Sequence, residues 1–104
     1  MRANLMRLTP SQTEAIQRVV RDIAGDDARL RIFGSRLDDD GTGGDVDLMV
    51  ELPEAVEHPA ALTAKLAARL IRALDGRDVD VLLLAPNLRH LPIHDVALRE
   101  GRLL

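Results

Sequence analysis

The chain has 104 residues, enough for one compact domain with one modest core. Its net charge of −3 and its aromatic content of 1% disfavour direct nucleic-acid binding, because neither bulk positive charge nor stacking side chains are available. Cysteine is absent, which excludes disulfides, thiolate zinc sites and cysteine nucleophiles.

The N-terminal stretch "MRANLMRLTPSQTEA" has no apolar core of the kind that a signal peptide needs. No segment of the sequence reaches the length of a membrane span. We therefore expect a cytoplasmic protein without membrane association. No internal repeat or interdomain linker interrupts the pattern, so we expect residues 1–104 to form a single domain.

A helix is predicted from Pro10 onward. Thr9 can cap it, Pro10 suits the first helical position, and Gln12 completes the spacing of a capping box. Apolar residues then recur at helical spacing as far as Gly25, which predicts the end of the helix. These apolar residues are Ile16, Val19, Val20 and Ile23.

Two strands are expected next. "RLRIF", from Arg29 to Phe33, predicts a short strand with a glycine after it. Residues 45–52 then alternate between aliphatic and mostly acidic side chains, which is typical of a half-buried strand, and Pro53 ends the pattern. The aliphatic positions are Val46, Leu48, Val50 and Leu52.

The second half repeats the alternation of helix and strand. A helix is predicted from about Pro59 to Leu74, with Gly76 after it, and its apolar side is formed by Leu62, Leu66, Leu70 and Leu74. The segment 78–84, "DVDVLLL", predicts a third strand that Pro86 stops. The order of elements indicates an α/β (α+β) fold, with a small mixed sheet of three to four strands covered by helices.

The C-terminal tail is predicted to be helical over residues 88–100. Pro92 stands either in the first turn of this helix or as a break in it. Ile93, Val96 and Ala97 are expected to face inward, and Gly101 ends the helix. The last residues, "RLL", either add a short edge strand or trail off.

Two aspartates stand inside the second strand, where a carboxylate is costly. Asp45 and Asp47 project from the same face, with Cα atoms about 6.5 to 7 Å apart. Unneutralised they repel each other, whereas a cation of the Mg²⁺ kind accepts both carboxylates. Asp80 repeats this feature in the third strand, with Val79 and Val81 on the opposite face. If these strands pair, the three acids form a triad that supports two metal ions.

A Gly-Ser pair follows the first strand directly. Gly34 lets the main chain approach a ligand closely, and Ser35 offers a hydroxyl and backbone N–H groups to phosphate. Arg36 adds a charge-assisted contact. The stretch from Phe33 to Leu52 thus predicts a phosphate cradle, a spacer and a metal pair, in that order.

"GS", a spacer, "DVDL" and a later strand acid in "VDVLLL" together resemble the minimal nucleotidyltransferases of the DNA polymerase beta superfamily. The resemblance covers nearly the whole chain and implies the nucleotidyltransferase fold. It implies that Gly34 and Ser35 bind the triphosphate and that Asp45 and Asp47 hold metal. Asp80 would hold the catalytic ion and help to deprotonate the acceptor.

The family transfers a nucleoside monophosphate, typically AMP from ATP, to a hydroxyl group with Mg²⁺. Many members are the antitoxin half of a two-gene module whose other half is an all-helical HEPN ribonuclease toxin, and there the hydroxyl belongs to a toxin tyrosine. The resemblance therefore implies a protein adenylyltransferase with ATP as substrate, Mg²⁺ (two ions) as cofactor and a HEPN toxin as partner. Acceptor, base preference and oligomeric state stay open.

Two other functions remain as alternatives. The spacer "RLDDDGTGG" has nine residues, one fewer than is common in the family, and it is acidic where the family is basic and glycine-rich. This favours, as an alternative, a catalytically weak or inactive antitoxin that neutralises its toxin by binding alone. The third hypothesis is nucleotidyl transfer to a small molecule, for which family enzymes carry additional acceptor domains.

Other polar residues have simpler interpretations. Asp38 to Asp40 are interpreted as a solvated loop. His90 and His94 are four residues apart, a zinc spacing, but no Glu follows His90 and Pro92 lies between them. We expect both histidines to be partly exposed. The arginines of the two long helices are expected to face solvent; they are Arg18, Arg21, Arg69 and Arg72.

Overall fold

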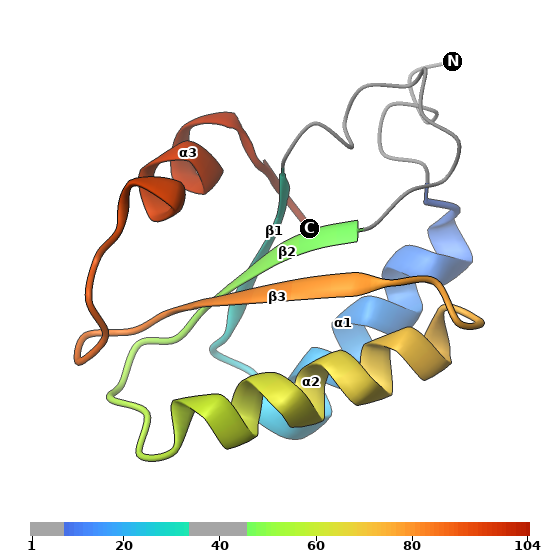
Figure 1. The fold of residues 1–104 in the computed structure, drawn as a ribbon. Coiled ribbons are helices and arrows are strands. Elements are labelled where there is room, and N and C mark those ends of the chain that lie inside the picture. Colours follow the sequence, from blue (N-terminus) through green and yellow to red (C-terminus); the bar gives the residue numbers. More distant parts are fainter. Residues whose placement is uncertain (1–7, 34–45) are drawn as a thin grey trace.

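A four-stranded mixed sheet with helices on both faces organises the chain (Figure 1). The computed structural model describes residues 8–33 and 46–104. In chain order the elements are α1 (Pro10–Ala24), β1 (Arg29–Phe33), β2 (Val46–Glu51), α2 (Pro59–Ala73), β3 (Val79–Leu84), α3 (Pro92–Glu100) and β4 (Arg102–Leu103). The predicted α/β (α+β) class is confirmed. No helix in these ranges is long and apolar enough to cross a membrane.

The strand order in the sheet is β3-β2-β1-β4. β2 and β3 run parallel, whereas β1 is antiparallel to both β2 and β4. Parallel neighbours need a crossover connection, and α2 provides it between β2 and β3. The pairing of β4 with β1 confirms that the C-terminal residues add a short edge strand.

The predicted start and end of α1 are confirmed. The Thr9 hydroxyl accepts from the Gln12 N–H at 3.1 Å, and the Gln12 side chain accepts from the Thr9 N–H at 2.9 Å. These two bonds form the expected capping box and pair two N–H groups that a helix start leaves unsatisfied. At the other end Gly25 takes a φ of 98°, which a residue with a Cβ rarely adopts.

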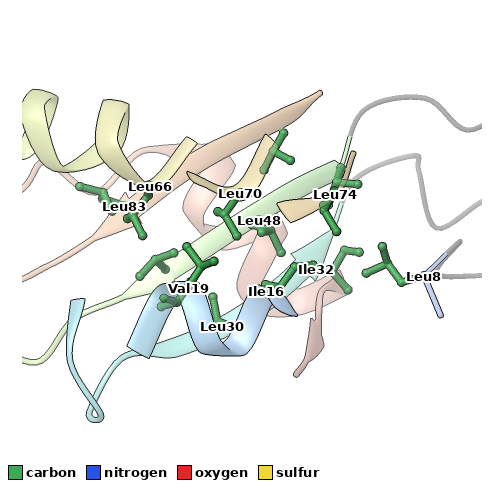
Figure 2. Close-up of a cluster of buried hydrophobic side chains, with 14 of the residues drawn as sticks. Leu8, Ile16, Val19, Leu30, Ile32, Leu48, Leu66, Leu70, Leu74 and Leu83 are labelled. Atoms are coloured by element: carbon green, nitrogen blue, oxygen red, sulfur yellow. The ribbon is translucent and has the colours of Figure 1, made fainter. Parts of the chain in front are cut away.

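α1 and α2 cover one face of the sheet and bury the main core (Figures 1 and 2). Leu48 of β2, Ile16 of α1, and Leu66 and Leu70 of α2 all have an exposed fraction of 0%. Burying each aliphatic side chain of this size contributes about 1.5–3 kcal/mol. The stripe of leucines predicted on the second helix is therefore core, because its central members point into the sheet.

α3 lies on the opposite face of the sheet (Figure 1), over a smaller cluster. Phe33 of β1, Met49 of β2 and Ala97 of α3 are buried there. The helix begins at Pro92 and not at residue 88, so of the two alternatives for this proline the first-turn position is confirmed. A residue before proline favours extended backbone, and Leu91 has a φ of −109° and a ψ of 162°.

One expectation about the inward face of α3 is wrong. Ile93 is 42% exposed, whereas His94 is only 2% exposed. Because the helix begins at Pro92, the residues that turn toward the sheet are His94 and Ala97, three positions apart on one helical face. Val96 is half-buried beside them.

Gly101 allows the chain to turn from α3 back onto the sheet. Its N–H donates to the Ala97 carbonyl at 2.9 Å, and a Cβ at this position would meet the carbonyl oxygens of Ala97 and Ile32. The next residues form β4 and pair with β1, with Leu103 opposite Arg31. The close approach that glycine permits thus holds the end of α3 against the sheet.

Thr9→Ala removes the acceptor that caps α1, so it should lower the free energy of unfolding by about 1 kcal/mol. The measurement is urea denaturation followed by circular dichroism. Ser11→Ala is the matched control, because Ser11 lies exposed in the same turn without a capping role, and it should change stability much less. Equal losses for the two variants would contradict the capping assignment.

Candidate active site

Two of the predicted acids stand side by side in the sheet. In the parallel register of β2 and β3, Asp47 pairs with Asp80, and Phe33 of β1 pairs with Asp47 on its other side. Neighbouring strands lie about 4.8 Å apart, and paired residues project from the same face. The condition stated in the sequence analysis, that the second and third strands pair, is therefore met for Asp47 and Asp80.

Both acids lie on the face of the sheet that carries α3. Their chain neighbours Val46 and Val79 are buried in the core under α1 and α2, and successive side chains of a strand point to opposite faces. Asp47 is half-buried and Asp80 is exposed. Like charges directly opposite each other destabilise a strand pair, so this arrangement favours a bound positive charge.

A cavity of about 370 Å³ opens over the two carboxylates. Apart from Asp47 and Asp80, its walls are apolar and come from the sheet and from α3: Phe33, Val81, Leu82, Ile93 and Val96. A larger hollow of about 410 Å³ lies between the end of α1 and the C-terminal residues. That hollow contains no pair of acids from adjacent strands, so the smaller cavity is the candidate site.

The remaining predicted site residues, Gly34, Ser35, Arg36 and Asp45, lie outside the described residues. The phosphate cradle and the first acid of the metal pair therefore stay predictions. Over residues 8–33 and 46–104, no three His, Asp or Glu side chains gather closely enough to hold a metal ion. Of the three acids predicted to meet, the described part of the chain contains Asp47 and Asp80.

His94 is a buried structural residue next to this site. It was expected to be partly exposed, and that expectation is wrong. Its Nδ1 accepts from the Leu91 N–H at 2.8 Å, and its Nε2 donates to the Leu83 carbonyl at 2.8 Å. Because both ring nitrogens have a partner, the ring can be buried. The two bonds tie the start of α3 to β3, three residues beyond Asp80.

A signal for this role was present in the sequence. His94 is the third residue of a helix that begins with Pro92, the position from which a capping-box side chain reaches back to the residue before the helix. His90, by contrast, is exposed and lies 2.7 Å from the Asp95 carboxylate. Both ring nitrogens of His94 are engaged within the protein, which leaves neither to a zinc ion and agrees with the sequence-based argument against zinc.

The family model of the nucleotidyltransferase domain matches residues 14–103, a range that includes every described strand and the pair Asp47 and Asp80. No curated protein matches the chain.

His94→Ala should lower the free energy of unfolding by about 2–4 kcal/mol, because it leaves the Leu83 carbonyl and the Leu91 N–H without their partner in the interior. Chemical denaturation measures the effect. His90→Ala is the matched control on the same segment, and its exposed pair with Asp95 should contribute less than about 0.5 kcal/mol. A stability loss at His90 as large as that at His94 would contradict the role given to the buried ring.

Proposed function

The chain belongs to the nucleotidyltransferase domain family, and from that premise we propose that it transfers AMP from ATP to a hydroxyl group of a partner protein with the help of Mg²⁺. We propose further that residues 1–104 act as one minimal nucleotidyltransferase domain in the cytoplasm. The partner would be an all-helical HEPN toxin, so that the chain is its antitoxin. Nucleotidyl transfer as such is the activity of the family.

The observation that carries this proposal is the register pairing of Asp47 with Asp80 over one cavity. The two carboxylates stand on adjacent strands and on the same face of the sheet, beside the apolar residues that line the cavity. Like charges at paired positions of neighbouring strands repel each other and cost stability. A cation bound between the two carboxylates, beside a substrate phosphate, would remove this repulsion and give the pair a function.

The donor set fits a hard divalent cation. Asp47 and Asp80 offer carboxylate oxygens, the ligands that Mg²⁺ prefers in proteins, and Asp45 is the proposed third donor. When bound, Mg²⁺ supplies positive charge that offsets the negative charge of the triphosphate and of the leaving group. The chain's own contribution is to hold these oxygens together at one edge of a rigid sheet.

In the proposed reaction the acceptor hydroxyl oxygen attacks the α-phosphorus of ATP. A new oxygen–phosphorus bond forms, the bond from the α-phosphorus to the bridging oxygen breaks, and pyrophosphate leaves with that oxygen. The hydroxyl proton passes to the Asp80 carboxylate and then to solvent. Since little covalent chemistry is left to the protein, positioning and charge supply most of the rate enhancement.

A protein acceptor is favoured by the space available. A cavity of about 370 Å³ is near the lower end of the range for small-molecule sites, so it offers little room for a second small substrate beside the nucleotide. An acceptor presented on the surface of another polypeptide needs only its reacting group to enter.

Asp80→Asn should lower the rate of AMP transfer by roughly a hundredfold or more, because it removes a charged oxygen from the reacting centre. The assay incubates the chain with α-labelled ATP, Mg²⁺ and the protein encoded by the adjacent gene, and follows label on that protein. Glu51→Gln is the matched control. It removes a carboxylate from the same face of the sheet as Asp80, but at the far end of β2. A wild-type chain that binds nucleotide but never labels the neighbour's product would refute the proposal.

A second candidate function is neutralisation by binding alone, which the acidic nine-residue spacer favours. The double variant Asp45→Asn with Asp47→Asn separates the two. Under the proposed function it should lose metal-dependent nucleotide binding and no longer protect cells from the toxin. Protection that persists after metal binding is lost would favour the binding-only antitoxin.

A further inference from the structure

β3 is an edge strand with one side of its main chain directed away from the sheet (Figure 1). The Asp78 carbonyl accepts from the Val46 N–H at 2.9 Å and the Leu84 carbonyl from the Leu52 N–H at 2.8 Å, so even-numbered residues direct their main chain toward β2. Main-chain groups alternate in direction along a strand. The odd-numbered residues Val79, Val81 and Leu83 therefore direct theirs outward.

His94 already occupies the far end of this edge. Its Nε2 donates to the Leu83 carbonyl, one of the outward groups. Within the described residues, no hydrogen bond from another element is found at the outward groups of Val79 and Val81. Natural proteins usually protect such edges with charges or proline. From Val79 to Leu84 the strand has Asp80 as its one charged residue and no proline.

The candidate cavity touches β3 at the residues that lie beside this part of the edge. Three consecutive residues of β3, Asp80, Val81 and Leu82, line it. The side chain of Val81 points to the opposite face from the other two, and it belongs with the core under α1 and α2. A cavity that touches all three therefore borders the main chain of this strand between Asp80 and Leu82.

We infer that the acceptor protein docks by adding a short extended segment to the edge of β3 at Val79–Val81, which places one of its side chains over Asp80. This inference rests on the proposed function, because it assumes a protein acceptor. Main-chain hydrogen bonds to Val79 and Val81 hold the segment, as in other cases of strand addition. A residue opposite Asp80 lies about 4.8 Å away across the strands and on the same face.

The walls of the cavity suit a side chain that is apolar along its length and ends in a hydroxyl group. Ile93 and Val96 of α3 and Phe33 and Leu82 of the sheet provide apolar contact. The two carboxylates provide the polar end, where the hydroxyl oxygen has to arrive. Ile93 is 42% exposed at this mouth, so contact with the segment would cover apolar surface that is otherwise in water.

A second copy of the chain fits this edge less well. Antiparallel pairing of two β3 strands about Val81 would place Val79 opposite Leu83 of the other copy, and it would require the Leu83 carbonyl as an acceptor. That carbonyl already accepts from His94 at 2.8 Å. The short stretch that remains open fits one segment of a partner better than a symmetric pair.

Val81→Pro tests the docking mode. Proline removes the outward N–H but leaves the ladder to β2 intact, and edge strands accept it when the N–H faces away from the sheet. Val81→Ala is the matched control, because it shortens the same side chain and keeps the N–H. With the neighbouring gene's product as acceptor, Val81→Pro should raise the KM for that protein roughly tenfold. Val81→Ala should raise this KM much less than Val81→Pro does, because it keeps the N–H.

Equal KM values for the two variants would overturn the inference.

Hydrogen exchange of the wild-type complex gives an independent readout, which is needed if Val81→Pro does not fold or if no transfer occurs. In the free chain the Val81 amide should exchange faster than those of Asp80 and Leu82. Protection of the Val79 and Val81 amides on adding the partner supports docking at the edge even if transfer fails. Unchanged exchange at both amides, or a homodimer that Val81→Pro dissociates, overturns it.

Discussion

The parallel, in-register pairing of β2 with β3 is the constraint on which the rest of the structure depends. It places Asp47 beside Asp80, although two like charges at paired positions cost stability. The fold remains stable despite this cost because α1 and α2 bury the apolar side chains on the other face of the same strands. Local rules are commonly broken at functional sites, where stability gained elsewhere in the fold compensates.

The two faces of the sheet have different tasks. The face under α1 and α2 holds the larger cluster, and its central side chains are completely buried (Figure 2). The face under α3 is covered by a nine-residue helix and a smaller cluster, which leaves a cavity over the carboxylates. Stability comes mainly from the first face, and the second leaves a cavity over the two carboxylates.

α3 is held in place at both of its ends. His94 ties its first turn to the Leu83 carbonyl of β3, and Gly101 brings its last turn against β1 before β4 begins. These contacts fix the position of Ile93 and Val96, the residues of α3 that line the cavity. The shape of the candidate site thus depends on residues that do not themselves meet a substrate.

The sequence by itself determined the elements and the residue types of the candidate site. The capping box at Thr9, the alternation in β2 and the carboxylate inside "VDVLLL" are patterns among neighbours in the chain, and local geometry decides them. The tertiary structure decided the register of Asp47 with Asp80, the burial of His94 and the open edge of β3. Each of these depends on which distant segments meet, and no local pattern specifies that. Gly34, Ser35, Arg36 and Asp45 remain predictions from sequence, since they lie outside the described part of the chain.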